Sequence, residues 1–163
     1  MGHQGVNRER EYRLLQRRLD QTVTGAPASP ALTRILEILY PPDEAALARR
    51  LPLQLTAVDE IARRWTASVH DLLPRLTAMA ERGLVFDLEH EGRRYFALAP
   101  LALGFFEFTF MRVRNDLPQA ELARLFESYM HESAEGIYQA VFCGPTQIGR
   151  TLVHEEALPP DDG

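Results

Sequence analysis

The 163-residue sequence predicts an α+β fold that is mostly α, a winged helix-turn-helix with N- and C-terminal helical extensions. Three observations predict it. Between Pro30 and Arg82 apolar residues recur at helical spacing, with residues typical of helix ends between the runs. After Gly83 the pattern changes to two short β-type runs around a polar turn. A series of helices followed by a hairpin is the element order of a winged helix. We place this domain at residues 29–100.

An arginine-rich helix is predicted ahead of this domain. Leu15 and Leu19 share one face of a helix over residues 8–22, and charged residues cover the rest. The sequence Thr-Gly-Ala-Pro at 24–27 is typical of a break. Residues 1–28 are therefore predicted to form a helical arm and a linker.

The domain is predicted to open with two helices. Ser29 is a good N-cap, and Pro30 suits the first helical position because its missing N–H has no partner there. An apolar stripe over residues 32–39 identifies the buried face, and two prolines end the helix. Asp43 is the predicted cap of a short second helix over residues 44–50.

Two further helices complete the helical part of the domain. Thr56 is the predicted cap of the first of them. The second ends before Gly83, which suits a helix C-cap. If this helix began at Ser68, Pro74 would lie in its interior at a cost of roughly 3 kcal/mol. We therefore predict that the cap is Asp71, so that Pro74 falls in the first turn.

A hairpin and a second helical region follow. The strands are predicted over residues 84–86 and 95–98, with a polar loop between them. Residues 101–158 are predicted to form an aromatic-rich helical extension, and residues 159–163 a tail. The expected elements of the extension are helices over 101–114 and 117–132, a helix or strand over 137–142 and a short strand over 151–153.

Four phenylalanines in the extension predict an interface. They are too closely spaced for a single buried helix face, so we expect them to contact a second copy of the chain or another protein. A homodimer is the favoured assembly. The four residues are Phe105, Phe106, Phe108 and Phe110.

Composition argues against several function classes. No apolar run reaches the ~18 residues that span a bilayer, and the N-terminus has no secretory signal, so a cytoplasmic protein without membrane contact is expected. Cys143 is the single cysteine, which excludes a zinc or iron–sulfur site made by cysteines of this sequence alone. The five histidines are scattered, and no nucleophile or phosphate-binding motif is present. We expect no enzyme activity, no cofactor and no metal.

DNA binding is an open alternative. The net charge is −5, all 18 basic residues are arginines, and residues 30–100 hold nine Arg against ten acidic residues. This balance disfavours phosphate binding, although local patches matter more than totals. A regulator would read DNA with the helix over residues 71–82 and its hairpin. The candidate contacts are Arg63, Arg64, His70, Arg75, Thr77, Arg93 and Arg94.

Several motifs resemble a known family. They are Gly-Leu-Val-Phe-Asp at 83–87, Tyr95, and Gly-Phe-Phe-Glu-Phe-Thr-Phe-Met-Arg at 104–112, with Gly-Ala-Pro at 25–27 and Thr-Gln-Ile-Gly-Arg at 146–150. Together they resemble the N-terminal region of bacterial and archaeal ferredoxin-type iron–sulfur proteins.

The resemblance covers roughly residues 8–158 and implies a winged-helix half that precedes a domain with clustered cysteines and [4Fe-4S] clusters. Those cysteines would lie beyond Gly163, so no cluster ligand carries over to this sequence. A [4Fe-4S] cofactor is expected only if such a C-terminal domain follows.

The sequence thus predicts a non-catalytic winged-helix regulatory or interaction module, whose partner is a protein or a C-terminal iron–sulfur domain. The alternative is a winged-helix DNA-binding transcriptional regulator. A third interpretation is a small-ligand sensor with a pocket between the phenylalanine helix and the winged helix.

Overall fold

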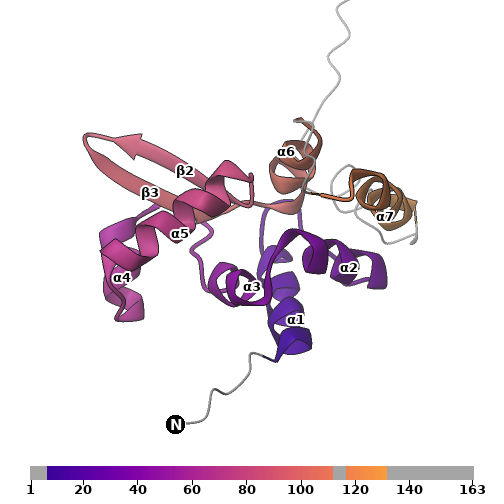
Figure 1. Ribbon diagram of the computed structural model, residues 1–163, viewed down its shortest axis with the longest axis horizontal. Helices are drawn as coiled ribbons and strands as arrows, with labels where there is room; N and C mark the ends of the chain where they lie inside the picture. The colour runs from indigo at the N-terminus through magenta and orange to yellow at the C-terminus, as the bar shows by residue number, and fades with distance from the viewer. Residues whose placement is uncertain (1–6, 112–116, 132–163) are drawn as a thin grey trace, which may run out of the picture.

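The computed structural model describes residues 7–111 and 117–131. They form a mostly helical fold with a three-stranded antiparallel sheet, which confirms the predicted α+β, mostly α class (Figure 1). The predictions for residues 137–142, 151–153 and 159–163 lie outside the described residues.

Four helices make up one side of the molecule. The predicted cap at Ser29 is confirmed, because its hydroxyl accepts the Leu32 N–H at 3.0 Å with Pro30 in the first turn. The first helix contacts the next two, and the last helix packs on the second. These helices are α1 (Arg8–Leu19), α2 (Pro30–Leu39), α3 (Pro42–Ala48) and α7 (Gln119–His131).

Buried tyrosines tie distant segments of this helical side together. The Tyr12 hydroxyl donates to the Tyr40 carbonyl at 2.8 Å, and the Tyr40 hydroxyl donates to the Leu84 carbonyl at 3.2 Å. The Tyr129 hydroxyl donates to the Pro27 carbonyl at 2.8 Å. The hydrophobic core therefore runs across the predicted boundary at residue 28, and α1 belongs to it.

The second side of the molecule contains the sheet and two helices. The strand order is β1-β3-β2, and Val85 to His90 on β2 pair with Leu98 to Arg93 on β3. The hairpin projects away from the helical side (Figure 1). The elements are β1 (Thr56–Ala57), α4 (Val58–Trp65), α5 (Val69–Glu81), β2 (Val85–His90) and β3 (Arg93–Leu98).

The prediction that Thr56 caps a helix is wrong. Thr56 lies in β1, where it pairs with Phe96, and its hydroxyl donates to the Gln54 carbonyl at 2.9 Å. Helix α4 begins at Val58 without a side-chain cap. The β-branched residue is used in the sheet, a tertiary pairing that the local capping pattern does not reveal.

The prediction that Asp71 caps α5 is also wrong. The helix begins at Val69, with Ser68 at the N-cap position, and Pro74 lies inside it. The Leu72 N–H donates a hydrogen bond to the Ser68 carbonyl at 3.0 Å, which closes the first turn of the helix. Burial of one face offsets the cost of the proline, because each buried side chain contributes about 1.5–3 kcal/mol. The buried residues of α5 are Leu72, Leu76 and Met79.

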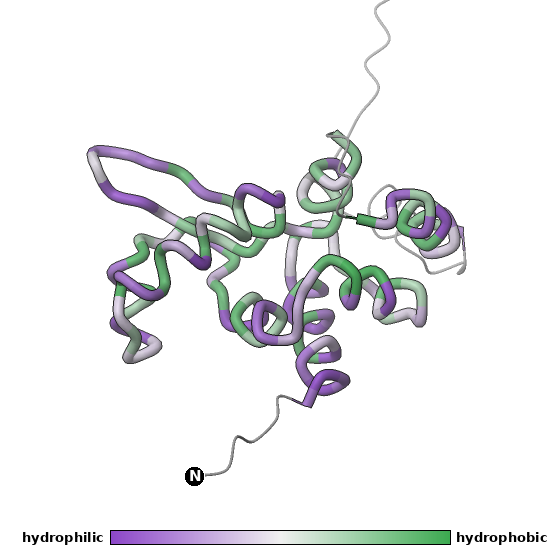
Figure 2. The backbone as a smooth tube through the Cα atoms, viewed as in Figure 1, coloured by the Kyte–Doolittle hydropathy of each residue, from purple (hydrophilic) through white to green (hydrophobic). Residues whose placement is uncertain are grey.

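The hairpin is longer than the sequence predicts. The stretch expected as a polar loop, 87–94, continues both strands and closes in a two-residue turn. Glu91 and Gly92 have φ of 50° and 72°, the positive values of a type I′ turn. Figure 2 shows that the outer half of the hairpin is hydrophilic. The apolar signal stops where burial stops, whereas the backbone hydrogen bonds continue.

The phenylalanine segment is an irregular helix. It begins as a π-helical turn, η1 (Leu101–Phe105), and continues as α6 (Phe106–Met111). The helix expected over 101–114 is therefore confirmed up to Met111, and the remainder lies outside the described residues.

Candidate functional site

The candidate nucleic-acid contacts lie on three neighbouring elements of the sheet side. Helix α4 carries Arg63 and Arg64, α5 carries His70, Arg75 and Thr77, and β3 carries Arg93 and Arg94.

Carboxylates neutralise the two arginines of the hairpin. Arg93 donates to both carboxylate oxygens of Asp59 on α4 at 3.0 Å, which joins the hairpin to that helix. These hydrogen bonds hold the pKa of the Asp59 carboxyl below its usual value and raise the pKa of Arg93. Arg94 pairs with Asp87 on β2 at 2.5 Å.

Two arginines of the helices are paired as well. Arg75 of α5 contacts Asp43 of α3 at 3.1 Å, and Arg64 pairs with Glu60 one turn away on α4. A phosphate could contact these guanidinium groups only in competition with carboxylates already in place. Because exposed ion pairs are weak, such an exchange costs little, but the acids stay beside the incoming phosphate and repel it.

The other three candidates contribute little positive charge. Arg63 is exposed and makes no ion pair within the part of the chain that the structure describes. His70 is exposed beside Asp71, with Nδ1 3.4 Å from a carboxylate oxygen. Thr77 is half-buried. Four of the seven candidates are thus neutralised in place.

The four phenylalanines do not share one surface. Phe105 is fully buried and meets the ring of Tyr40 edge-on at 6.2 Å. Phe106 is half-buried, with its ring 4.8 Å from that of Phe126. Phe105, which was predicted to lie in the interface, is therefore part of the hydrophobic core, and a partner could contact it only if the helix unfolded.

The remaining two phenylalanines stay accessible. Phe108 and Phe110 are 40% and 39% exposed, and the following Met111 is 72% exposed. These three residues form an exposed apolar surface on α6, which we call the α6 surface.

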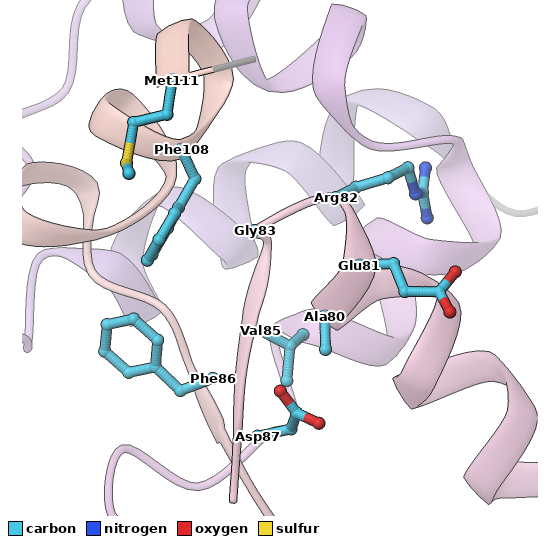
Figure 3. A pocket seen from close by; sticks show the side chains of 9 residues that line it. All are labelled: Ala80, Glu81, Arg82, Gly83, Val85, Phe86, Asp87, Phe108 and Met111. Atoms are coloured by element: carbon cyan, nitrogen blue, oxygen red, sulfur yellow. The ribbon is translucent and has the colours of Figure 1, made fainter.

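A hollow of about 420 Å³ borders the α6 surface, between α6 on one side and α5 with β2 on the other (Figure 3). Its apolar wall is built from Phe86, Phe108 and Met111, and its opposite wall presents the carboxylates of Glu81 and Asp87. It lies where a pocket between the phenylalanine helix and the predicted winged helix was expected.

Gly83 sets the width of this hollow. Its φ is +76°, which favours glycine, and a Cβ placed there would lie 2.3 Å from the Cβ of Phe108. The close approach of the backbone to α6 thus requires glycine at the start of the hairpin.

A second hollow, of about 380 Å³, lies between α1, the segment after α3 and α4. Sequence reasoning missed it, because its lining comes from segments far apart in the chain. The pair of Arg50 and Trp65, with the guanidinium 4.6 Å from the ring centroid, has no sequence spacing that would predict it.

Residues 7–111 and 117–131 contain neither of two features that would indicate a metal site or a membrane span. Within these ranges no group of three or more His, Cys, Asp or Glu residues could hold a metal ion. None of the helices in the same ranges is both long and apolar enough to cross a bilayer.

Comparison with protein-family models, with curated proteins and with solved structures found no match. The resemblance to ferredoxin-type iron–sulfur proteins stays a prediction from the motifs that carry it.

Proposed function

We propose that residues 29–100 form a winged helix-turn-helix and that the chain is a non-catalytic regulatory or interaction module that binds protein. The element order α2-α3-β1-α4-α5-β2-β3 and the sheet order β1-β3-β2 support the winged helix. In this proposal α4 and α5 are the helix-turn-helix, and the β2–β3 hairpin is the wing.

The observation that favours a protein partner over DNA is the pairing of charges on α4, α5 and the hairpin. DNA affinity comes mainly from cations that displace counterions from phosphates. On this face Arg64, Arg75 and Arg94 each meet a carboxylate, and Arg93 meets Asp59 through two hydrogen bonds. A surface with balanced charge suits a protein partner better than a polyanion.

The α6 surface supplies an apolar contact for that partner. Its exposed side chains, Phe108, Phe110 and Met111, are of the kind enriched in the centre of protein interfaces. The resemblance to ferredoxin-type proteins names the partner that we propose, an iron–sulfur domain. A second copy of the chain is the other arrangement that this surface would suit.

Titration of labelled duplex DNA, followed by fluorescence anisotropy at several salt concentrations, tests the choice. We expect no saturable binding by the wild-type chain near physiological salt. The double variant Asp59→Asn/Asp87→Asn, which frees Arg93 and Arg94, should bind with a clear salt dependence. Tight wild-type binding with a steep salt slope would instead support the alternative, a DNA-binding transcriptional regulator that uses the exposed Arg63.

A matched control separates local charge from total charge. Glu37→Gln/Glu121→Gln frees Arg34, which pairs with both carboxylates on the α2–α7 side, and changes the net charge by the same amount. We expect this variant to behave as the wild type. Equal DNA binding by both double variants would show that net charge alone, and not the face around the hairpin, governs binding.

The partner is tested on the native protein, isolated from its own cells through an epitope tag. A native species that is clearly heavier than 18.5 kDa, or one in a stable complex, with bound iron would support the iron–sulfur proposal. An iron-free species of 18.5 kDa without a partner would contradict it and place the DNA-binding alternative first.

A further inference from the structure

A second hollow lies between α1, α4 and the segment that follows α3, and its lining contains arginines but no acidic residue. Its lining includes Arg18, Arg50 and Arg64, and no Asp or Glu. Arg64 shares its charge with Glu60 outside the lining, whereas neither Arg18 nor Arg50 makes an ion pair with a residue that the structure describes. The positive charge of the hollow is therefore incompletely compensated.

Uncharged groups hold Arg18 in place. Its Nε and Nη2 donate to the Leu51 carbonyl at 3.1 and 2.9 Å, and its Nη1 donates to the Gln21 side-chain oxygen at 2.9 Å. These bonds orient the guanidinium but do not cancel its charge. A fixed cation binds an anion better than a mobile one because less conformational entropy is lost on binding.

The ring of Trp65 positions the second cation. The Arg50 guanidinium lies 4.6 Å from the ring centroid, a cation–π contact that leaves its positive charge in place. Arginines that join elements elsewhere meet carboxylates instead, as Arg49 at the C-terminal end of α3 does with Glu11 of α1, and Arg82 with Glu44. The hollow departs from this pattern.

We propose that this hollow binds a small organic anion, whose carboxylate lies between Arg18 and Arg50 and whose apolar body contacts Pro52 and Leu53. Guanidinium groups match the geometry of a carboxylate. The volume of about 380 Å³ falls in the range of small-molecule pockets, roughly 300–1,000 Å³. Pro52 and Leu53 offer the body of an organic anion an apolar contact that free phosphate cannot use. This inference does not depend on whether the module binds protein or DNA.

The chain contains a single tryptophan, and Trp65 lines the hollow, so intrinsic fluorescence reports directly on binding. The probe is sodium benzoate, titrated at constant ionic strength. We expect a saturable change in emission, because the anion draws Arg50 away from the ring. Benzamide, the neutral analogue of similar shape, should give no saturable change.

Two variants locate the binding. Arg50→Gln should weaken benzoate binding by at least about tenfold, the loss expected for a charged hydrogen bond. Arg63→Gln, on the exposed face of α4 outside the lining, is the matched control and should bind as the wild type does. Circular dichroism would confirm that both variants fold.

Several outcomes would overturn the proposal. They are an absence of saturation, an equal response to benzamide, or equal weakening by the two variants. A stronger response to inorganic phosphate or to duplex DNA than to benzoate would also overturn it, and would assign the hollow to phosphate recognition.

Discussion

The helical side and the sheet side of the molecule are stabilised in different ways. On the helical side, α1, α2 and α7 bury apolar side chains, and the hydroxyls of Tyr12 and Tyr129 donate to backbone carbonyls of other segments. Ion pairs are present there as well, between Arg34 and Glu121 and between Arg49 and Glu11. On the sheet side, the side-chain links between elements are exposed ion pairs, which join the hairpin to α4, its two strands to each other, and α5 to α3 of the helical side. Salt screens exposed ion pairs, which also exchange readily, whereas buried contacts are screened much less. Loss of an exposed ion pair on the sheet side should therefore cost less stability than loss of a buried side chain on the helical side.

The largest expected effect separates two neighbouring aromatic residues. Phe105→Ala should lower the free energy of unfolding by about 3–5 kcal/mol, because it empties a fully buried site beside Tyr40. Phe108→Ala removes a side chain that is 40% exposed and should cost about 1 kcal/mol, mainly its edge contact with Phe86. Urea unfolding measures both. Similar losses would contradict the assignment of Phe105 to the core.

The second effect is a dependence on alkaline pH. Burial raises the pKa of Tyr40 above its ordinary value of 10.0. The unfolded chain releases this proton above about pH 10 while the folded chain keeps it, so stability is constant below that pH and falls above it. Each such tyrosine contributes a slope of about 1.4 kcal/mol per pH unit.

Removal of the Tyr40 hydroxyl gives a second test of the same pH dependence. Tyr40→Phe should cost about 1–2 kcal/mol at neutral pH, because the Leu84 carbonyl loses its donor from Tyr40. The same variant should lose stability less steeply above pH 10. An alkaline slope equal to that of the wild type would show that Tyr40 does not stay protonated in the folded chain.

The smallest effect is expected on the sheet side. Asp59→Asn breaks the ion pair between Asp59 and Arg93, and both of these side chains are about half exposed. The change in the free energy of unfolding should therefore be smaller than for Phe105→Ala or Tyr40→Phe. Chemical denaturation with urea at low and at high salt checks this. The difference from the wild type should shrink as salt rises, and a large loss that salt does not change would show that the pair is shielded from solvent.

The sequence by itself determined the elements whose signals are local. The apolar stripe over 32–39, the cap at Ser29 and the mixed α+β class all follow from nearest-neighbour spacing, because backbone capping and amphipathicity involve residues within a few positions. The sequence also predicts that part of the phenylalanine segment is exposed, since four aromatic residues in six positions are too many for a single buried helix face.

Only the tertiary structure decided the rest. Thr56 became a strand residue because Phe96 lies opposite, and α5 kept Pro74 inside because the burial of its apolar face outweighed the local cost. The pairing of arginines with carboxylates, and the hollow around Trp65, join residues that are distant in the chain. Charge balance on a surface is a sum over neighbours in space, and spacing along a single sequence does not contain it.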